Sequence, residues 1–181
     1  MKTMLGVAFA TLVAMSGVAH AAHLNPEEYC VAAGGTVQTR IPEYGTNSTT
    51  PLVLANPQQF CQWISPKDQS QIDVQLNTLV AEKPTLAVLA YYAKVHVNLH
   101  KCSAGPGSCY CSDLGGTDEF GGINLNGGGW VLNTNATDVL DVCVFPDESA
   151  IDAYGLFYHS HGIIRGVNLK NLLVYKNPYE K

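Results

Sequence analysis

Hydrophobic and polar positions along this chain recur at helical spacing in several separate segments. In each segment the apolar residues return every three or four positions, and capping or stop residues flank most of the segments. Asn25 and Pro26 predict a well-defined start for the first helix, and Gly34 predicts its end. Ser70 and Ser149 are interpreted as further helix starts. The predicted helices cover residues 25–33, 70–80, 85–98, 106–114 and 146–158.

Shorter segments are rich in β-branched and aromatic residues, or they alternate between apolar and polar positions, which predicts strands. These strands cover residues 36–41, 60–64, 130–132 and 139–145. Two long stretches are rich in glycine, proline, asparagine or threonine and are predicted to be loops. They are residues 42–59 and 120–129.

One motif occurs twice in the chain. Tyr29-Cys30, three residues and Gly-Gly-Thr return 81 positions later, beginning at Tyr110. This repeat predicts two units of helix, strand, strand and helix, over residues 22–102 and 103–181. Because a lone two-stranded hairpin is marginal in water, we expect the units to share one antiparallel sheet, with helices on one side. The predicted fold class is α+β, pseudo-symmetric and stapled by disulfides.

The N-terminal stretch has the form of a secretory signal peptide. Lys2 provides the positive start, an apolar run extends from Leu5 to Met15, and Ala19-His20-Ala21 fits a cleavage site. We expect residues 1–21 to be removed and the mature protein to reach the periplasm or the cell exterior. No later apolar run is long enough to predict a membrane span.

The chain has an even number of cysteines, which behind a signal peptide predicts disulfides. Sequence alone allows many disulfide pairings among these cysteines, but the repeated motif favours one of them. Cys30 and Cys61 lie 31 residues apart, and Cys111 and Cys143 lie 32 apart. We expect these two equivalent bridges, with Cys102 paired to Cys109. A zinc site is disfavoured because no Cys-x-x-Cys pair occurs.

The charge of the chain limits its possible partners. The formal net charge is −5, and lysine and arginine form no cluster. Nucleic acid and anionic membrane surfaces are therefore poor partners on electrostatic grounds. We expect the partner to be a protein or a cell-envelope component, and the sequence predicts no cofactor and no particular oligomeric state.

Two segments resemble a known family. Residues 25–36 read Asn-Pro-x-x-Tyr-Cys-x-x-x-Gly-Gly-Thr, and residues 143–158 read Cys-Val-Phe-Pro-Asp-x-Ser-x-Ile-Asp-x-Tyr-x-Leu-Phe-Tyr. This pattern resembles a small exported bacterial domain of unknown function that is labelled a hemolysin. The resemblance implies two diverged copies, over about 25–99 and 106–170, and supplies no catalytic residues. The family's usual glycine is Glu148 here, and its usual tryptophan is Tyr154.

His159 and His161 are the candidate metal ligands. Residues two apart share a face in a strand, but near the end of a helix they point about 200° apart. Histidine close to a helix C-terminus is also favoured by the helix dipole. A metal site and a purely structural role both remain open for this pair.

Trp63, Trp130 and Tyr158 are the candidate partner-binding aromatics. The alternative is that they fill the interface between the two units. Three functions follow from these observations. The preferred one is an exported, non-catalytic binding protein, because no nucleophile motif occurs. The others are a secreted protease inhibitor that uses the long loops, and a metal-binding protein or hydrolase that uses His159 and His161.

Overall fold

The structure is a computed structural model of the chain, and it describes residues 25–97, 102–118 and 126–179. The predicted signal peptide over 1–21 lies outside these ranges, as does most of the predicted loop 120–129. The described helices are α1 (Pro26–Ala32), α2 (Leu76–Leu79), α3 (Leu86–Ala93), α4 (Pro106–Asp113), α5 (Ala153–Ser160) and the 3-10 helix η2 (Leu169–Asn171). The strands are β1 (Thr36–Tyr44), β2 (Leu52–Val53), β3 (Gln58–Ile64), β4 (Gln71–Gln75), β5 (Gly128–Leu132), β6 (Asn135–Leu140), β7 (Val142–Val144) and β8 (Ala150–Asp152).

All of these strands belong to one antiparallel sheet. The strand order is β6–β5–β1–β3–β4–β8–β7, and β2 pairs only with the end of β1. The outermost strands of this order, β6 and β7, are consecutive in the chain and are separated by Asp141 alone. The sheet therefore curls back on itself, and we call it the curled sheet. The predicted fold class, α+β with an antiparallel sheet and disulfides, is confirmed.

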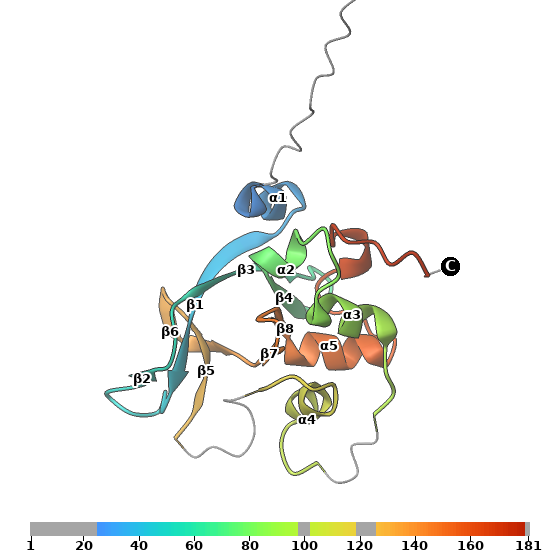
Figure 1. Cartoon of the computed structure of the whole chain (residues 1–181). Helices are drawn as coiled ribbons and strands as arrows, with labels where there is room; N and C mark the ends of the chain where they lie inside the picture. Colours follow the sequence, from blue (N-terminus) through green and yellow to red (C-terminus); the bar gives the residue numbers. More distant parts are fainter. Residues whose placement is uncertain (1–24, 98–101, 119–125, 180–181) are drawn as a thin grey trace, which may run out of the picture.

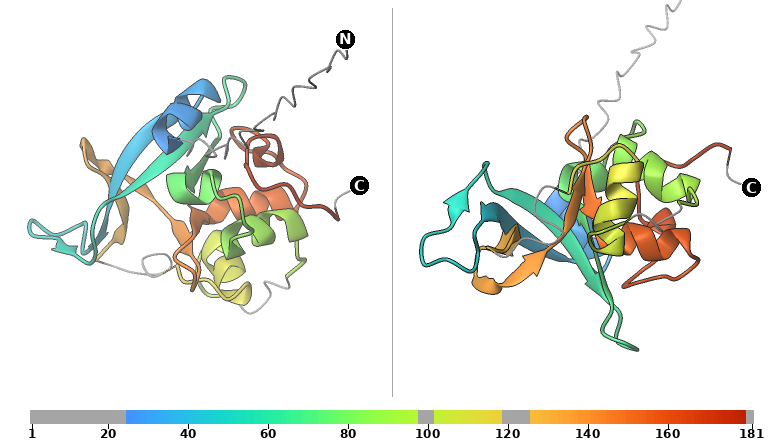
Figure 2. Two further views of the ribbon diagram at one scale, coloured as in Figure 1. Left: turned by 45° about the horizontal axis from the view of Figure 1, so that its top comes forward. Right: turned by 90° about the horizontal axis from the view of Figure 1, so that it is seen from below.

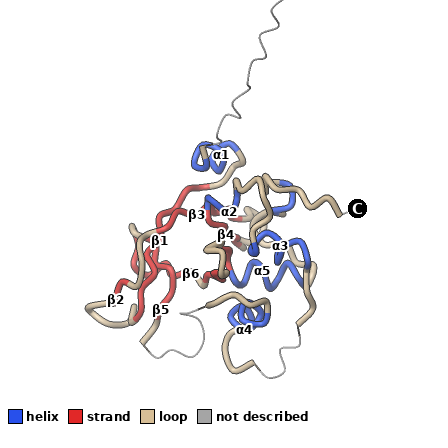
Figure 3. Tube along the Cα trace, viewed as in Figure 1, coloured by secondary structure: helices blue, strands red, loops and turns tan. Residues whose placement is uncertain are grey.

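The helices gather on one side of the curled sheet (Figures 1 and 3). Helix α5 lies beside β4 and β8, α2 lies beside β3 and β4, and α1 lies near β1. Helices α3 and α4 both pack against α5. On the opposite side a segment projects from the body in every view (Figure 2). This segment, residues 45–57, includes β2, and we call it the arm.

Strand alternation divides the interior into two hydrophobic clusters. Inward-facing residues form a small cluster inside the curled sheet: Phe60, Trp130, Leu140, Val142 and Ala150. Their neighbours along the strands point outward and join the larger core under the helices, among them Cys61, Ile72, Val74, Cys143 and Ile151. Successive side chains of a strand point to opposite faces of the sheet, so alternate residues join different clusters.

The structure corrects two helix predictions. Residues 71–75 and 150–152, predicted to be helical, form β4 and β8, and α2 and α5 begin only after them. These strands are too short for a period of 2 to be distinguished from a period of 3.6 in the sequence. Their strand conformation is decided by pairing, because Val74 lies opposite Ile151 where β4 meets β8. The curled sheet consequently has more strands than the predicted units supplied.

Three disulfides form: Cys30–Cys61, Cys102–Cys109 and Cys111–Cys143. This is the pairing that the repeat predicts. The two glycine pairs of the repeated motif occupy matching environments beside the longer bridges. Gly34 and Gly115 have φ of +77° and +81° and end α1 and α4. A Cβ atom added to Gly35 would lie 2.3 Å from the Cys61 sulfur, and one on Gly116 would lie 2.5 Å from the Cys143 sulfur.

Two turns share one hydrogen-bond pattern. In the β3–β4 turn, Asp68 Oδ1 accepts from the N–H and hydroxyl of Ser70, and in the β7–β8 turn Asp147 Oδ1 accepts from those of Ser149. Each serine hydroxyl also accepts a hydrogen bond from a backbone N–H in the other predicted unit. Ser70 accepts from Gly166 at 3.2 Å, and Ser149 accepts from Ala87 at 3.0 Å. The serines interpreted as helix caps therefore stabilise turns and join distant segments.

Candidate binding groove

A groove of about 770 Å³ opens at one end of the curled sheet. Because neighbouring strands are antiparallel, the end of β1, the start of β3, the end of β4 and the start of β8 meet at this end. The volume lies within the range of ~300–1,000 Å³ that is typical of ligand sites, which often occupy the mouths of curled or closed sheets. The lining residues that matter below are Leu54, Asn56, Gln58, Gln75, Asn77, Thr78, Thr85, Thr117, Trp130, Asp147, Glu148 and Ser149.

The floor of the groove is a chain of hydrogen bonds between inward-facing polar side chains. Gln75 Nε2 donates to Gln58 Oε1 at 3.3 Å, and the Thr78 hydroxyl donates to Gln75 Oε1 at 3.0 Å. Thr78 Oγ1 in turn accepts the N–H of Ala150 at 3.1 Å. Beside this chain lies Trp130, which is 7% exposed and packs edge-on against Phe60. The floor is thus held in place by strands from both parts of the sequence.

One wall of the groove holds the start of helix α3. Asp147 Oδ2 accepts the N–H of Leu86 at 2.8 Å, Ser149 Oγ accepts that of Ala87, and the N-cap Thr85 accepts that of Val88. Free N–H groups at a helix start attract anions. Here side-chain oxygens already occupy them, so this helix end offers no anion site to a ligand.

The charge of the lining is negative. Asp147 and Glu148 line the groove, and no lysine, arginine or histidine does so in the described parts of the chain. Partial burial opposes ionisation of Asp147, but hydrogen bonds from Ser149 and the Leu86 N–H hold its pKa below the ordinary value. The groove therefore presents carboxylate, amide and hydroxyl groups, together with the edge of one tryptophan.

A buried charge network lies behind the groove. Arg40 is fully buried on β1, and its Nη1 donates to Asp138 Oδ1 at 3.0 Å and to the carbonyl of Trp130 at 3.1 Å. The guanidinium also donates twice to Gln38. Asp73 lies 3.9 Å from Arg40. Arg40 thus ties β5 and β6 to β1 and fixes the backbone that carries Trp130.

Burial governs ionisation of the aspartates in this network. Burial and the nearby charge of Asp152 raise the pKa of Asp73 to about 7, although Arg40 and a hydrogen bond from Gln62 act in the opposite direction. Burial also raises the pKa of Asp152 to about 6, against hydrogen bonds from Gly155 and Tyr154 and the charge of Arg165. These carboxyls are therefore more easily protonated in the folded than in the unfolded chain.

We expect the change in unfolding free energy caused by Asp73→Asn to be more favourable to the variant at pH 7 than at pH 5. The folded pKa of Asp73 lies above its unfolded value, so the proton favours folding, and that contribution is lost as the pH rises through about 7. The difference in unfolding free energy between Asp73→Asn and the wild type should shift by about 2 kcal/mol across this window. Chemical denaturation at both pH values measures it. A pH-independent difference would contradict the raised pKa of Asp73.

The structure does not bring the predicted binding aromatics together. Trp130 lines the groove. Trp63 lies in the larger core, where its indole N–H donates to the carbonyl of Ala33 at 3.1 Å. Tyr158 lies on α5, with the Arg165 guanidinium carbon 5.0 Å from the centre of its ring. Trp130 alone is placed to meet a ligand in the groove.

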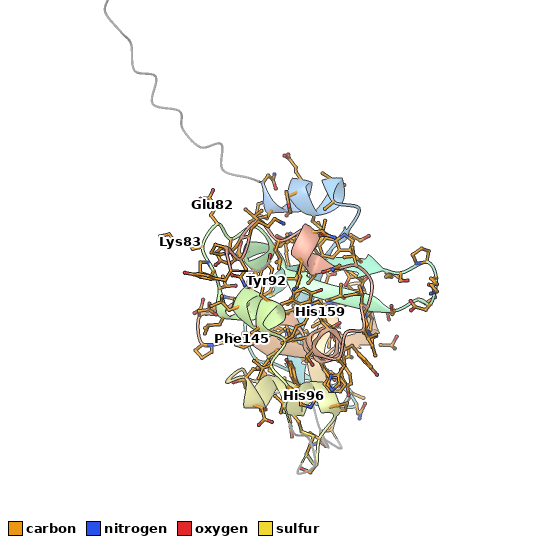
Figure 4. The ribbon with its side chains drawn as sticks, turned by 90° about the vertical axis from the view of Figure 1, so that its right-hand side faces the viewer. Glu82, Lys83, Tyr92, His96, Phe145 and His159 are labelled. Carbon is orange, nitrogen blue, oxygen red and sulfur yellow. A yellow bond between two sulfur atoms is a disulfide. The ribbon has the colours of Figure 1, made fainter. Side chains whose placement is uncertain are left out.

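The predicted metal ligands point to different surroundings. His159, labelled in Figure 4, is 2% exposed. Its ring stacks on the ring of Tyr91, with ring centres 3.7 Å apart. Burial lowers the pKa of His159 to about 4. His161 is exposed, and its Nδ1 lies 3.0 Å from the carbonyl oxygen of Phe157. In residues 25–97, 102–118 and 126–179 no three His, Cys, Asp or Glu side chains lie close enough to hold a metal ion.

Most of the groove residues were not predicted individually from the sequence. Gln75, Asn77 and Thr78 lie in the segment after Ser70, which was predicted to be a helix, and Gln58 lies near the end of the predicted loop 42–59. The available signal was the alternation of polar with apolar residues over 71–75, which places Gln71, Asp73 and Gln75 on one face of a strand. Their partners across the groove lie far away in the sequence and carry no local signal.

No described helix has both the length and the apolar composition that a membrane span requires. Comparison with protein-family models, with curated proteins and with solved structures found no match to this chain.

Proposed function

We propose that this protein is an exported, non-catalytic binding protein that holds an extended segment of a partner protein in the groove. The observation that carries the proposal is the groove itself, which is formed without a ligand and is lined by hydrogen-bonding side chains. Among residues 25–97, 102–118 and 126–179 the lining contains no histidine or cysteine, and the one serine that lines it is engaged with Asp147 and the Ala87 N–H. The lining therefore favours binding over nucleophilic chemistry.

The chemistry of the groove suits a peptide backbone. Carboxamide and hydroxyl groups can each donate and accept hydrogen bonds. The carboxamides of Asn56, Gln58 and Asn77 can therefore pair with both the N–H and the C=O groups of an extended chain. The arm continues this surface, because Leu54 lines the groove and Leu52 and Val53 are exposed next to it. In the described chain β2 pairs with β1 alone, which leaves its other edge open to a strand.

Export is part of the proposal. It rests on the predicted signal peptide over residues 1–21 and on the three disulfides, which persist in oxidising compartments such as the periplasm or the cell exterior. We also propose that the two halves are diverged copies of the hemolysin-labelled domain. The matching glycine pairs and the reciprocal serine contacts support this origin.

Filling the groove is expected to abolish peptide binding. Asn77 is exposed on α2 at the groove, so the substitution Asn77→Trp should occupy the space without disturbing the core. A library of blocked pentapeptides is passed over the immobilised protein, and the affinities of retained sequences are measured by calorimetry. Asn77→Trp should weaken them by about tenfold or more.

The matched control is Asn133→Trp, an exposed asparagine in the β5–β6 turn that does not line the groove. It should bind the retained peptides as the wild type does. If the wild type retains no peptide, or if both variants bind equally well, peptide capture in the groove is wrong. Retention of oligosaccharides in place of peptides would assign the groove to a glycan.

The arm favours a second candidate function, secreted protease inhibition. It projects from the body and carries exposed apolar side chains at Leu52 and Val53, as a loop that enters a protease cleft would. Its base is held by pairing of Glu43 and Tyr44 with β2. Failure to inhibit a panel of secreted serine and cysteine proteases would remove this candidate.

A further inference from the structure

We infer that the segment captured in the groove carries a lysine or arginine, whose cationic group lies against Glu148. This inference deepens the proposed function and rests on it. It identifies the chemistry of the partner: an extended peptide with a basic side chain that reaches the β7–β8 turn.

The first argument is the one-sided charge of the groove. Both charged lining residues, Asp147 and Glu148, are acidic, and they face a lining of amides, hydroxyls and apolar groups. A ligand carboxylate or phosphate would find no cation among the described lining residues. A ligand cation would find two carboxylates, carried by the exposed residues Asp147 and Glu148, and no opposing charge among the described lining residues.

The second argument separates the two carboxylates. Asp147 is occupied, because its oxygens accept from Leu86, from the Ser149 N–H and from the Ser149 hydroxyl. Its charge also faces the positive end of the α3 dipole, which compensates part of it. Glu148 differs, because its carboxylate makes no hydrogen bond or ion pair with any described residue. Glu148 is therefore the acceptor that remains for a ligand.

The third argument is that the nearest internal cation cannot neutralise this site. Arg40 lies behind Trp130 and is committed to Asp138, to Gln38 and to the Trp130 carbonyl. It is fully buried and does not line the groove. Arg40 therefore does not offset the charge of Asp147 and Glu148, and a basic side chain of a ligand would be the opposite charge at this rim.

The apolar surface beside the rim specifies the rest of the ligand. Leu54 and Val144 line the groove, and Leu52 and Val53 are exposed on the adjoining arm. A peptide that places a basic residue at Glu148 and apolar residues along Leu54 and the arm would match both surfaces. An acidic peptide would match neither the charge nor the available acceptors.

The test uses pentapeptide sublibraries in which one position is fixed as lysine, as acetyl-lysine or as glutamate. Acetylation removes the charge while keeping the side chain, so it isolates the charge contribution. We expect the wild type to retain a fixed-lysine sublibrary about two- to fivefold more strongly than its acetyl-lysine counterpart, as an ion pair with an exposed carboxylate would produce. Glu148→Gln should remove this preference, and Glu82→Gln, an exposed carboxylate outside the lining, should keep it.

The outcomes separate this inference from the function on which it rests. Equal retention of lysine and acetyl-lysine sublibraries by the wild type overturns the inference and leaves peptide capture standing. A lysine preference that survives Glu148→Gln overturns the assignment to Glu148. Retention of no sublibrary at all overturns peptide capture, and the inference with it. Circular dichroism of Glu148→Gln establishes that the variant is folded.

Discussion

Replacing Arg40 by methionine is expected to lower the free energy of unfolding by about 3–5 kcal/mol, the usual loss when one partner of a buried charge pair is removed. Methionine fills much of the volume of the arginine stem, so the effect isolates the guanidinium. Without it, Asp73 keeps a fully buried carboxyl that has lost the one cation paired with it in the described part of the chain, and the Trp130 carbonyl loses a donor. Urea denaturation at pH 8, where Asp73 is ionised in the folded protein, measures the loss.

Two further variants test the reason for this loss. Asp73→Asn in the Arg40→Met background should recover part of the stability, because it removes the carboxyl that was left unpaired. Asp138→Asn should recover less, since the Asp138 side chain is one third exposed and water can solvate it. Lys67→Met, at an exposed position, is the neutral control. An Arg40→Met loss no larger than that of Lys67→Met would mean that the network does not stabilise the fold.

The second large effect is expected at the glycine pair of the repeated motif. Gly35→Ala should destabilise the protein by about 3 kcal/mol or more, the upper range for overpacking a filled core. Its new Cβ would lie 2.3 Å from the Cys61 sulfur and 2.9 Å from the Trp63 ring. The disulfide and the ring are both buried, so neither can move aside cheaply. Denaturation with the disulfides intact measures the change.

Gly34→Ala provides the matched comparison one residue earlier. Its added Cβ would meet nothing within 4 Å, so only the left-handed φ of +77° opposes it. That backbone strain costs about 1–2 kcal/mol. The same contrast should hold for Gly116→Ala against Gly115→Ala, because Gly116 abuts the Cys111–Cys143 bridge and Gly115 does not. Equal losses within each pair would contradict the steric role that we assign to Gly35 and Gly116 beside the disulfides.

Local chemistry made several elements of the fold predictable. The α1 start is one of them, since the Asn25 side chain accepts from the N–H groups of Glu27 and Glu28 in the structure. The glycine stops of α1 and α4 depend only on φ, which is a local property. The disulfide pairing followed from equal separations in the two copies of the motif. The cap and the glycine stops depend on residues that are close together in the sequence. The disulfide pairing could be predicted because the same cysteine spacing occurs twice.

Elements that depend on distant partners were less predictable. Helix α3 was predicted to continue to residue 98, but it ends at Ala93, where Lys94 takes a left-handed φ of 47°. The strands β4 and β8 were predicted as helix, and their pairing with each other decides otherwise. For the candidate site, Trp130 was the only groove residue predicted, and the choice was based on its aromatic type, not its position.

The sequence by itself determined the fold class, the first helix, the glycine stops and the cysteine pairing, because these follow from short motifs and composition. Export remains a proposal that rests on the N-terminal sequence pattern and the disulfides. The tertiary structure alone decided the curled sheet, the groove and the Arg40 network. These depend on Arg40 of β1 meeting Asp138 of β6, and on Gln58 and Gln75 meeting the β7–β8 turn near Ser149. Such meetings result from strand pairing over long separations, where each residue's own neighbourhood in the chain carries no information about its partner.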